Sequence, residues 1–232
     1  MSDYLYEVDK ECALCSQSFR VTKVKSRLIK IKQDSDFCTY YKDVNPYYYS
    51  IWVCPHCGYA AVDTQFDSLV PAAKEKLTKF LTERQVNVNF CGNRTREQAI
   101  ATYKLAIFYS EMLDSSASKL GGLYLKLAWL YREAGYTEQE QAALSKAVEH
   151  YEQALFRERL PLGSMTEVTL TFLVGDLFRR TGQVEKAIPY FNKILSNPQA
   201  KAERNIYNLA REVWQEIRDL RKQQELEAVA ES

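Results

Sequence analysis

The pattern of hydrophobic and polar residues divides the chain at about residue 63. Before that point, short stretches rich in aromatic and β-branched residues alternate with polar ones, as in half-buried β-strands. After it, apolar residues recur three and four positions apart, which is the spacing of one face of an α-helix. The pattern therefore predicts an α+β protein that is mostly α, with a small β-module ahead of a helical region.

The β-region contains three segments with the composition of strands. Residues 19–32, FRVTKVKSRLIKIK, alternate well enough to predict two short strands on either side of Lys25 and Ser26. Residues 47–53, YYYSIWV, consist almost entirely of aromatic and β-branched residues and predict a third strand. Residues 1–11 are expected to be a frayed lead-in, and residues 33–46 to be a loop because they are rich in turn-forming residues.

In the helical region, polar residues and glycines mark the ends of several helices. Thr95, Thr137 and Ser164 each stand three residues before a Gln or a Glu, the spacing of a capping box that opens a helix. Gly135 and Gly182 follow apolar-periodic stretches and are expected to stop them. The predicted helices span about residues 72–84, 96–109, 117–134, 138–157, 165–181, 184–195 and 199–228.

Two stretches of the helical region resemble each other and resemble a tetratricopeptide repeat. In residues 173–198, small residues, aromatic residues and a closing proline occupy the positions that such a repeat gives them; these are Gly175, Phe178, Gly182, Ala187, Phe191 and Pro198. A poorer copy begins at residue 127, where Ala128, Tyr131 and Gly135 match. Residues 99–107 resemble the second helix of an earlier unit, so we expect three helical pairs and a capping helix. A plain helical bundle is the alternative, because small and aromatic residues at helical spacing occur in any helical core.

Four of the six cysteines form two Cys-x-x-Cys units, Cys12 with Cys15 and Cys54 with Cys57. Two such units beside predicted strands are typical of a zinc ribbon, in which four thiolates hold one zinc ion. Because four thiolates leave no position open for water or substrate, the expected Zn²⁺ is structural rather than catalytic. Ordinary thiols and a redox dithiol are the alternatives, although a thioredoxin-type pair needs its unit at the start of a helix. His56, between two of the ligands, is expected to be exposed.

These patterns divide the chain into three parts. Residues 1–63 are expected to form a zinc-ribbon-like module, residues 64–94 a connecting helix and linker, and residues 95–232 a tetratricopeptide-like helical domain. The expected architecture is thus a small N-terminal β zinc ribbon, followed by an α-helical array of helix pairs with a long C-terminal helix.

Composition indicates an ordinary globular protein. Its 232 residues are 46% hydrophobic and 26% charged, and a net charge of +1 gives no overall attraction to nucleic acid or to an anionic membrane. The first residues, MSDYLYEVDKEC, lack the apolar core of a secretory signal, and no apolar run reaches the roughly 18 residues of a membrane helix. We therefore expect a cytoplasmic protein without a membrane partner, in which Cys38 and Cys91 are reduced thiols.

The combination of motifs also resembles a known family. The segments CALC (12–15), NPYYYSIWVCPHCGYAA (45–61), LKLAWLYREAG (125–135) and LVGDLFRRTGQVEKAIPYF (173–191) are similar to an uncharacterised bacterial family known as domain of unknown function 2225. The resemblance covers residues 12–195. It implies a bacterial cytosolic protein with a zinc-binding N-terminal part and tetratricopeptide-like helices, and it implies no activity.

The expected helical array offers a groove for a partner. In tetratricopeptide repeats the first helix of each pair lines the concave face, and equivalent positions of the two best units hold Arg132 and Arg179. Trp129 and Asp176 are also equivalent. These four residues predict a site for a protein or peptide that presents an acidic segment or a free C-terminus. The alternative is that both arginines pair with acids of the chain itself, such as Glu133 or Asp176.

The function that these observations favour is a non-enzymatic zinc-binding adaptor or scaffold that binds a protein through a helical-repeat groove. A nucleic-acid-binding zinc ribbon is the first alternative, since residues 20–32 carry six basic side chains and no acid. Because residues 1–63 hold eight basic and eight acidic side chains, nucleic acid is not the expected partner. A metal or redox enzyme comes third, since two histidines, His56 and His150, can hardly build a Ser-His-Asp or multi-histidine site. Asp34 and Asp36 are typical of a turn.

Overall fold

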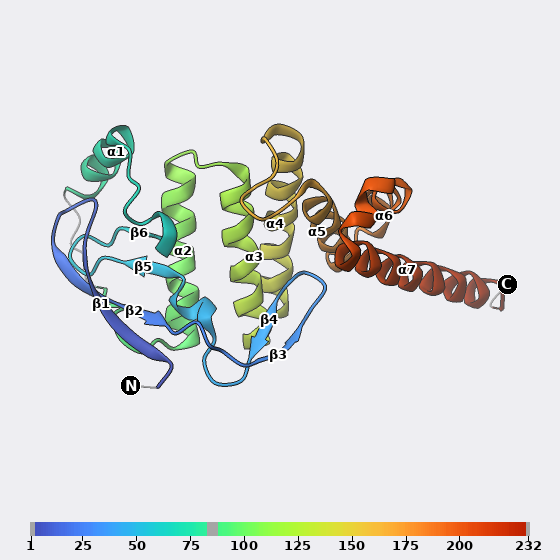
Figure 1. Cartoon of the computed structure of the whole chain (residues 1–232), viewed down its shortest axis with the longest axis horizontal. Coiled ribbons are helices and arrows are strands. Elements are labelled where there is room, and N and C mark those ends of the chain that lie inside the picture. Colours follow the sequence, from blue (N-terminus) through green and yellow to red (C-terminus); the bar gives the residue numbers. More distant parts are fainter. Residues whose placement is uncertain (1–2, 83–87, 231–232) are drawn as a thin grey trace.

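The computed structural model describes residues 3–82 and 88–230, and within them three β-hairpins precede seven α-helices (Figure 1). Each hairpin is a separate two-stranded antiparallel sheet: β1 (Leu5–Glu11) with β2 (Ser18–Val24), β3 (Lys30–Gln33) with β4 (Thr39–Tyr41), and β5 (Ile51–Val53) with β6 (Ala60–Val62). The helices are α1 (Pro71–Leu81), α2 (Arg96–Met112), α3 (Ala117–Ala134), α4 (Thr137–Arg157), α5 (Glu167–Arg180), α6 (Val184–Ser196) and α7 (Arg204–Ala230). The predicted α+β class with mostly helical content is confirmed.

Consecutive helices lie in contact with one another from α2 to α7. In Figure 1, α2, α3 and α4 stand side by side, α5 and α6 follow, and α7 extends away from the body towards the C-terminus. Strands β5 and β6 contact α2, so the N-terminal hairpins are held against the first part of this row. As far as the described residues extend, none of these helices is long and apolar enough to cross a membrane.

The helices lie where the sequence predicts them, while two of the three predicted capping boxes are wrong. Thr95 caps α2 in a complete capping box, as predicted. Helix α4 begins at Thr137 itself, so Tyr136 takes the N-cap position, and its side chain makes no cap hydrogen bond. Helix α5 is capped by the hydroxyl of Thr166 instead of by Ser164. Residues 198–202 form a 3₁₀ helix ahead of α7, and residues 83 and 84 of the first predicted helix lie outside the described residues.

The β-region differs more from its prediction. Residues 5–11, expected to be a lead-in, form β1, because β2 supplies a pairing partner along its whole length. Residues 46–49 form a 3₁₀ helix rather than the start of a strand, since Pro46 opens it and the side chain of Asn45 caps it. Part of the expected 33–46 loop forms β4, and residues 19–32 contribute β2 and β3 to two different sheets.

Small residues allow neighbouring helices to approach closely. Gly121 of α3 faces the ring of Tyr151 on α4, and a Cβ added there would lie 2.9 Å from the ring carbon Cγ. Gly175 of α5, the residue predicted at a helix contact, would place a Cβ 3.1 Å from the Cβ of Tyr190 on α6. These helices share one buried hydrophobic cluster with the hairpins, extending from Cys12 to Ile217.

The close approach of α3 and α4 predicts that Gly121→Ala destabilises the protein. The added methyl group must displace the buried ring of Tyr151, and overpacking of this kind typically costs about 1–3 kcal/mol. Gly122→Ala is the matched control, since its Cβ would meet only the Tyr151 hydroxyl at 3.3 Å. Chemical denaturation of both variants measures the difference, and equal free energies of unfolding would contradict this account of the helix contact.

Candidate metal centre

The turns of two hairpins carry the four cysteines of the candidate site. Cys12 and Cys15 lie in the β1–β2 turn, and Cys54 and Cys57 lie in the β5–β6 turn. Both turns have the same backbone hydrogen bond, in which the amide four residues after the first cysteine donates to that cysteine's carbonyl oxygen, at 2.8 Å and 2.9 Å. The donor is Gly58 in the second turn, with a φ of 76° that glycine adopts freely. The sequence thus builds two like turns whose thiols meet.

The spacing of the four sulfur atoms fits a tetrahedral metal ion. The Sγ atoms of Cys12 and Cys57 lie 3.7 Å apart, as do those of Cys15 and Cys54. All four Sγ atoms lie within 4.8 Å of one another. Four thiolates bound at about 2.3 Å to a tetrahedral metal stand about 3.8 Å apart, so little movement is needed for binding. Among the residues that the structure describes, no other group of three or more His, Cys, Asp or Glu side chains gathers in this way.

The thiols of the cluster differ in their tendency to ionise because they hydrogen-bond to one another, and contacts with Cys12 and Cys54 raise the pKa of Cys57. Hydrogen bonds from Cys12 and Cys57 lower the pKa of Cys54 to about 4, outweighing the burial that raises it. His56 is exposed, as expected, and its Nε2 lies 3.2 Å from the carbonyl oxygen of Ser18. It therefore links the second cysteine turn to β2 instead of pointing at the sulfur atoms.

A metal in this position would cross-link two hairpins that are distant in the sequence. Cys15 and Cys54 are separated by 39 residues, and the full set of four ligands closes the coordination sphere. A metal bound there would hold β1–β2 against β5–β6. Because β5 and β6 contact α2, it would also fix these two hairpins to the helical row.

A second polar site lies where the β3–β4 hairpin meets the helices. Asp36, near the tip of this hairpin, is fully buried. Its carboxylate accepts hydrogen bonds from Nε1 of Trp129 at 3.0 Å and from the guanidinium of Arg132 at 2.7 and 3.2 Å. Arg132 also donates to Asp34 at 3.1 Å and to Glu140 at 2.7 Å. Three carboxylates of the same chain therefore surround this arginine.

Asp176 of α5, also fully buried, forms the other half of this site. Its carboxylate pairs with Arg179 at 2.7 Å and with Arg180 at 2.8 Å, and it accepts a hydrogen bond from the hydroxyl of Ser35 at 2.7 Å. Arg180 in turn lies 3.8 Å from Asp36, which joins the two halves. We call the whole set the aspartate–arginine cluster; it comprises Asp34, Asp36, Arg132, Glu140, Asp176, Arg179 and Arg180.

The cluster corrects the prediction of an open groove for a partner. The structure does bring the four predicted residues near the same place, but the tip of the β3–β4 hairpin occupies it; these residues are Trp129, Arg132, Asp176 and Arg179. Both arginines pair with acids of the chain, which was the alternative. Glu133 is not among those acids, because it accepts hydrogen bonds from Asn45 and Tyr48.

Sequence reasoning missed the hairpin tip and Arg180 as parts of this site. The signal that would have found them is an Asp-x-Asp pair between two strand-like segments, in a chain that also carries adjacent arginines at the end of a buried helix. Asp34 and Asp36 form the turn that the sequence predicts, and they also pair with Arg132.

The charges of the cluster reinforce one another. Burial raises the pKa of Asp34, but hydrogen bonds from Tyr40 and Lys32 outweigh it, and the pKa lies below its usual range. For Arg132, burial lowers the pKa, but the hydrogen bond and attraction of Asp36 raise it overall. Because the pKa of Asp34 is lower in the folded chain, its stabilisation is present above the unfolded pKa and is lost as the pH falls through the folded pKa.

The cluster predicts that Asp36→Ala is strongly destabilising. Removing this carboxylate leaves the indole N–H of Trp129 without its acceptor and takes from Arg132 the one fully buried of its three carboxylates, and breaking a buried ion pair typically costs about 3–5 kcal/mol. Asp9→Ala is the control, because Asp9 pairs only at the surface, at 3.6 Å from Arg20, and exposed pairs contribute less than about 1 kcal/mol. Urea denaturation gives both values, and hydrogen exchange should show faster exchange of β3 and β4 in Asp36→Ala alone. A variant as stable as the wild type would refute the role given to Asp36.

Comparisons with known proteins place the chain in a family. The sequence profile of a family described as "Uncharacterized protein conserved in bacteria (DUF2225)" matches residues 5–217. An uncharacterised protein of Borreliella burgdorferi is 32% identical over 122 residues, which cover 46% of this chain and 44% of that protein. The aligned part is thus less than half the length of this relative, and no solved structure matches the chain. Since the profile spans both cysteine turns and the helices to α7, the chain belongs to this family of uncharacterised bacterial proteins.

Proposed function

We propose that the chain is a non-enzymatic adaptor in which one structural zinc ion holds the N-terminal hairpins and the helical region binds a protein partner. The observation that carries this proposal is the four-cysteine cluster, whose sulfur spacing fits a closed tetrahedral site. The aspartate–arginine cluster, a second buried polar site, is saturated by its own ion pairs. Both sites therefore serve the architecture, and the helical surface is left for binding.

Zinc is the metal that this donor set favours. Four thiolates in a tetrahedral arrangement select zinc or iron among the common metals, because soft sulfur ligands suit these ions. Zinc needs no redox chemistry around it, and structural zinc sites of this composition are common in small β-modules. The two cysteine turns at the ends of antiparallel hairpins match such a module.

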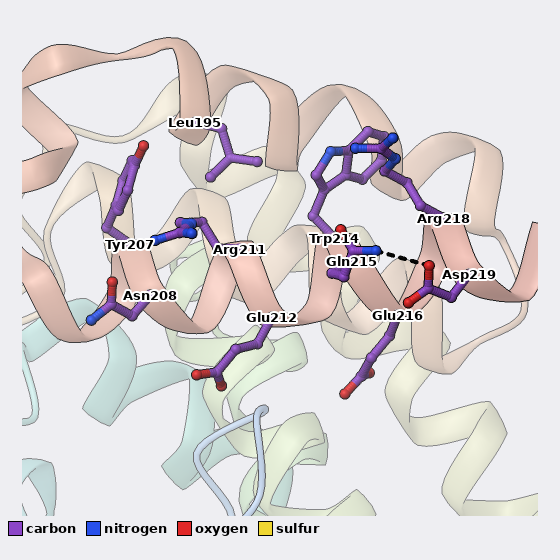
Figure 2. A pocket seen from close by; sticks show the side chains of 10 residues that line it. All are labelled: Leu195, Tyr207, Asn208, Arg211, Glu212, Trp214, Gln215, Glu216, Arg218 and Asp219. Atoms are coloured by element: carbon purple, nitrogen blue, oxygen red, sulfur yellow. Dashed lines mark hydrogen bonds between the residues drawn. The ribbon is translucent and has the colours of Figure 1, made fainter.

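The part of the helical region that offers a binding surface is a groove along α6 and α7. The groove encloses about 850 Å³, and Figure 2 shows Leu195, Tyr207, Arg211, Trp214 and Arg218 on one side of α7. In the same view Glu212 and Glu216 point away from that side. The lining combines Leu195, Tyr207 and Trp214 with two arginines and with Asp219, so a partner segment that fits it would place apolar side chains on the rings and acidic ones at Arg211 and Arg218.

The zinc proposal predicts one tightly bound zinc ion per chain in protein purified without added metal. Cys57→Ser removes one ligand and should lose the metal and unfold the N-terminal hairpins, since structural zinc contributes folding free energy. Cys91→Ser is the control, because this half-buried cysteine lies outside the cluster. Elemental analysis and thermal denaturation read out both effects. Iron in place of zinc, or a metal-free chain of unchanged stability, would overturn the proposal.

The adaptor proposal predicts that the α6–α7 groove selects a partner. In affinity capture from lysate of the native bacterium, the double variant Arg211→Glu with Arg218→Glu should lose a protein that the wild type retains. Both side chains are exposed, so the fold should persist. Arg159→Glu, exposed in the α4–α5 connection, is the control for charge reversal. An acidic peptide from the captured protein should then bind the wild type at least tenfold more tightly than the double variant. Equal capture by all three chains would count against the groove.

A further inference from the structure

The basic segment that leads into and forms β3 has an unpaired edge. Strand β3 pairs with β4 on one side, and the described residues supply no strand on its other side. All four residues of β3 are exposed. Ile29, just before β3, is 54% exposed, and Ile31, at the irregularity in pairing between Lys30 and Lys32, is 65% exposed. An exposed edge with apolar side chains is a template for an added strand.

The charges along this edge all have one sign. Arg27, Lys30 and Lys32 project from residues 27–32, which contain no acid. Arg27 and Lys30 form no ion pair within the part of the chain that the structure describes, and Lys32 has only Asp34 at 3.3 Å. Residues 1–63 have equal numbers of basic and acidic side chains, but this strand and the residues before it are locally basic.

Several of the acidic residues that balance these cations in the count over residues 1–63 pair with arginines elsewhere in the fold. Asp34 and Asp36 face Arg132, and Glu7 lies 3.4 Å from Arg20 across the β1–β2 pair. Strand β1, with Glu7, Asp9 and Glu11, thus pairs as an acidic strand against the more basic β2. Strand β3 is basic like β2, but no acidic strand of the described residues pairs with its free edge.

We propose that β3 is a docking edge for an extended acidic segment of a partner protein, which adds to the sheet as a further strand beside β3. Main-chain hydrogen bonds hold such a segment, its carboxylates pair with Arg27, Lys30 and Lys32, and its apolar side chains cover Ile29 and Ile31. The lysines also discourage pairing with a neutral or basic strand, so they select for acidic partners. This docking edge is separate from the α6–α7 groove, and neither proposal depends on the other.

An open cavity extends the docking edge at its N-terminal end. It encloses about 460 Å³ and is lined by Asp3, Tyr4, Tyr6, Lys25, Ser26 and Arg27. Tyr6 is 40% exposed there. A side chain at one end of the added strand would enter this cavity, which gives the partner a direction along β3.

The side chains around the edge favour a peptide over a nucleic acid. Single-stranded nucleic acids bind proteins by stacking bases on exposed aromatic rings. Here the ring of Tyr40 lies under the ammonium group of Lys32 at 4.2 Å, and Tyr41 packs edge-on against Tyr47 with ring centroids 6.2 Å apart. The residues between the cations are aliphatic, as an added strand requires.

The test uses the zinc-loaded full chain and a fluorescein-labelled eight-residue peptide in which Glu and Val alternate. Fluorescence anisotropy should show saturable binding, and hydrogen exchange should show protection of residues 27–33 when the peptide is bound. Lys30→Glu should weaken binding at least tenfold, while Lys74→Glu, the same change on the exposed face of α1, should leave it unchanged. The same peptide with alternate amides N-methylated keeps its charges but cannot pair as a strand, and should not bind.

Three results would overturn the docking edge. The first is an absence of saturable binding, and the second is equal binding of the N-methylated peptide, which would reduce the effect to charge attraction. The third is preference for another occupant at the same residues. If an oligonucleotide binds the wild type more tightly than the peptide does, and Lys30→Glu abolishes that binding, the occupant is nucleic acid. Self-association that Lys30→Glu abolishes in analytical ultracentrifugation would indicate a second copy of this chain, pairing through the acidic β1.

Discussion

The burial of Asp36 is the constraint on which the arrangement of this protein depends. A carboxylate with no exposure is stable only if hydrogen bonds and opposite charges replace its water, and its partners Trp129 and Arg132 both lie on α3. The β3–β4 hairpin therefore has one position against the helices. Since Ser35 and Asp176 extend the same network to α5, the hairpin also fixes α3 relative to α5.

The cysteine cluster acts on the two hairpins that this network does not reach. It joins the β1–β2 turn to the β5–β6 turn, and β5 and β6 rest on α2. The N-terminal hairpins thus meet one another at the cysteine cluster and meet the helices through β5 and β6 at α2 and through ion pairs and hydrogen bonds at α3 and α5. The segment between the cysteine pairs carries the middle hairpin, so the cysteine cluster and the aspartate–arginine cluster constrain the same stretch of chain.

The sequence predicts well what depends on near neighbours in the chain. Helix positions, the capping box at Thr95 and the two cysteine turns follow from spacings of three or four residues, and the structure has them. It predicts poorly what depends on distant partners. Strand β1 is polar and gains its structure from β2, and Arg132 appears free until Asp36, 96 residues away, is placed beside it. Spacing along the sequence cannot identify a distant carboxylate such as Asp36 as the partner of an arginine, because the contact forms only when the chain between them closes a loop.

The aspartate–arginine cluster also explains why net charge is a poor guide to the surface of this protein. The chain is nearly neutral at +1, but four of its acids face inward to three arginines, and two more pair with Arg20. Among the described residues, Arg27 and Lys30 beside β3 and Arg211 and Arg218 beside Trp214 have no such partners, and each pair lies next to exposed or half-exposed apolar side chains. Local fields of this kind act within about a Debye length, near 8 Å at physiological salt, so each surface presents its own charge to a partner regardless of the total. A chain that pairs its helical arginines with its own hairpin therefore leaves unpaired cations at the edge of that hairpin and at the far end of the helical row.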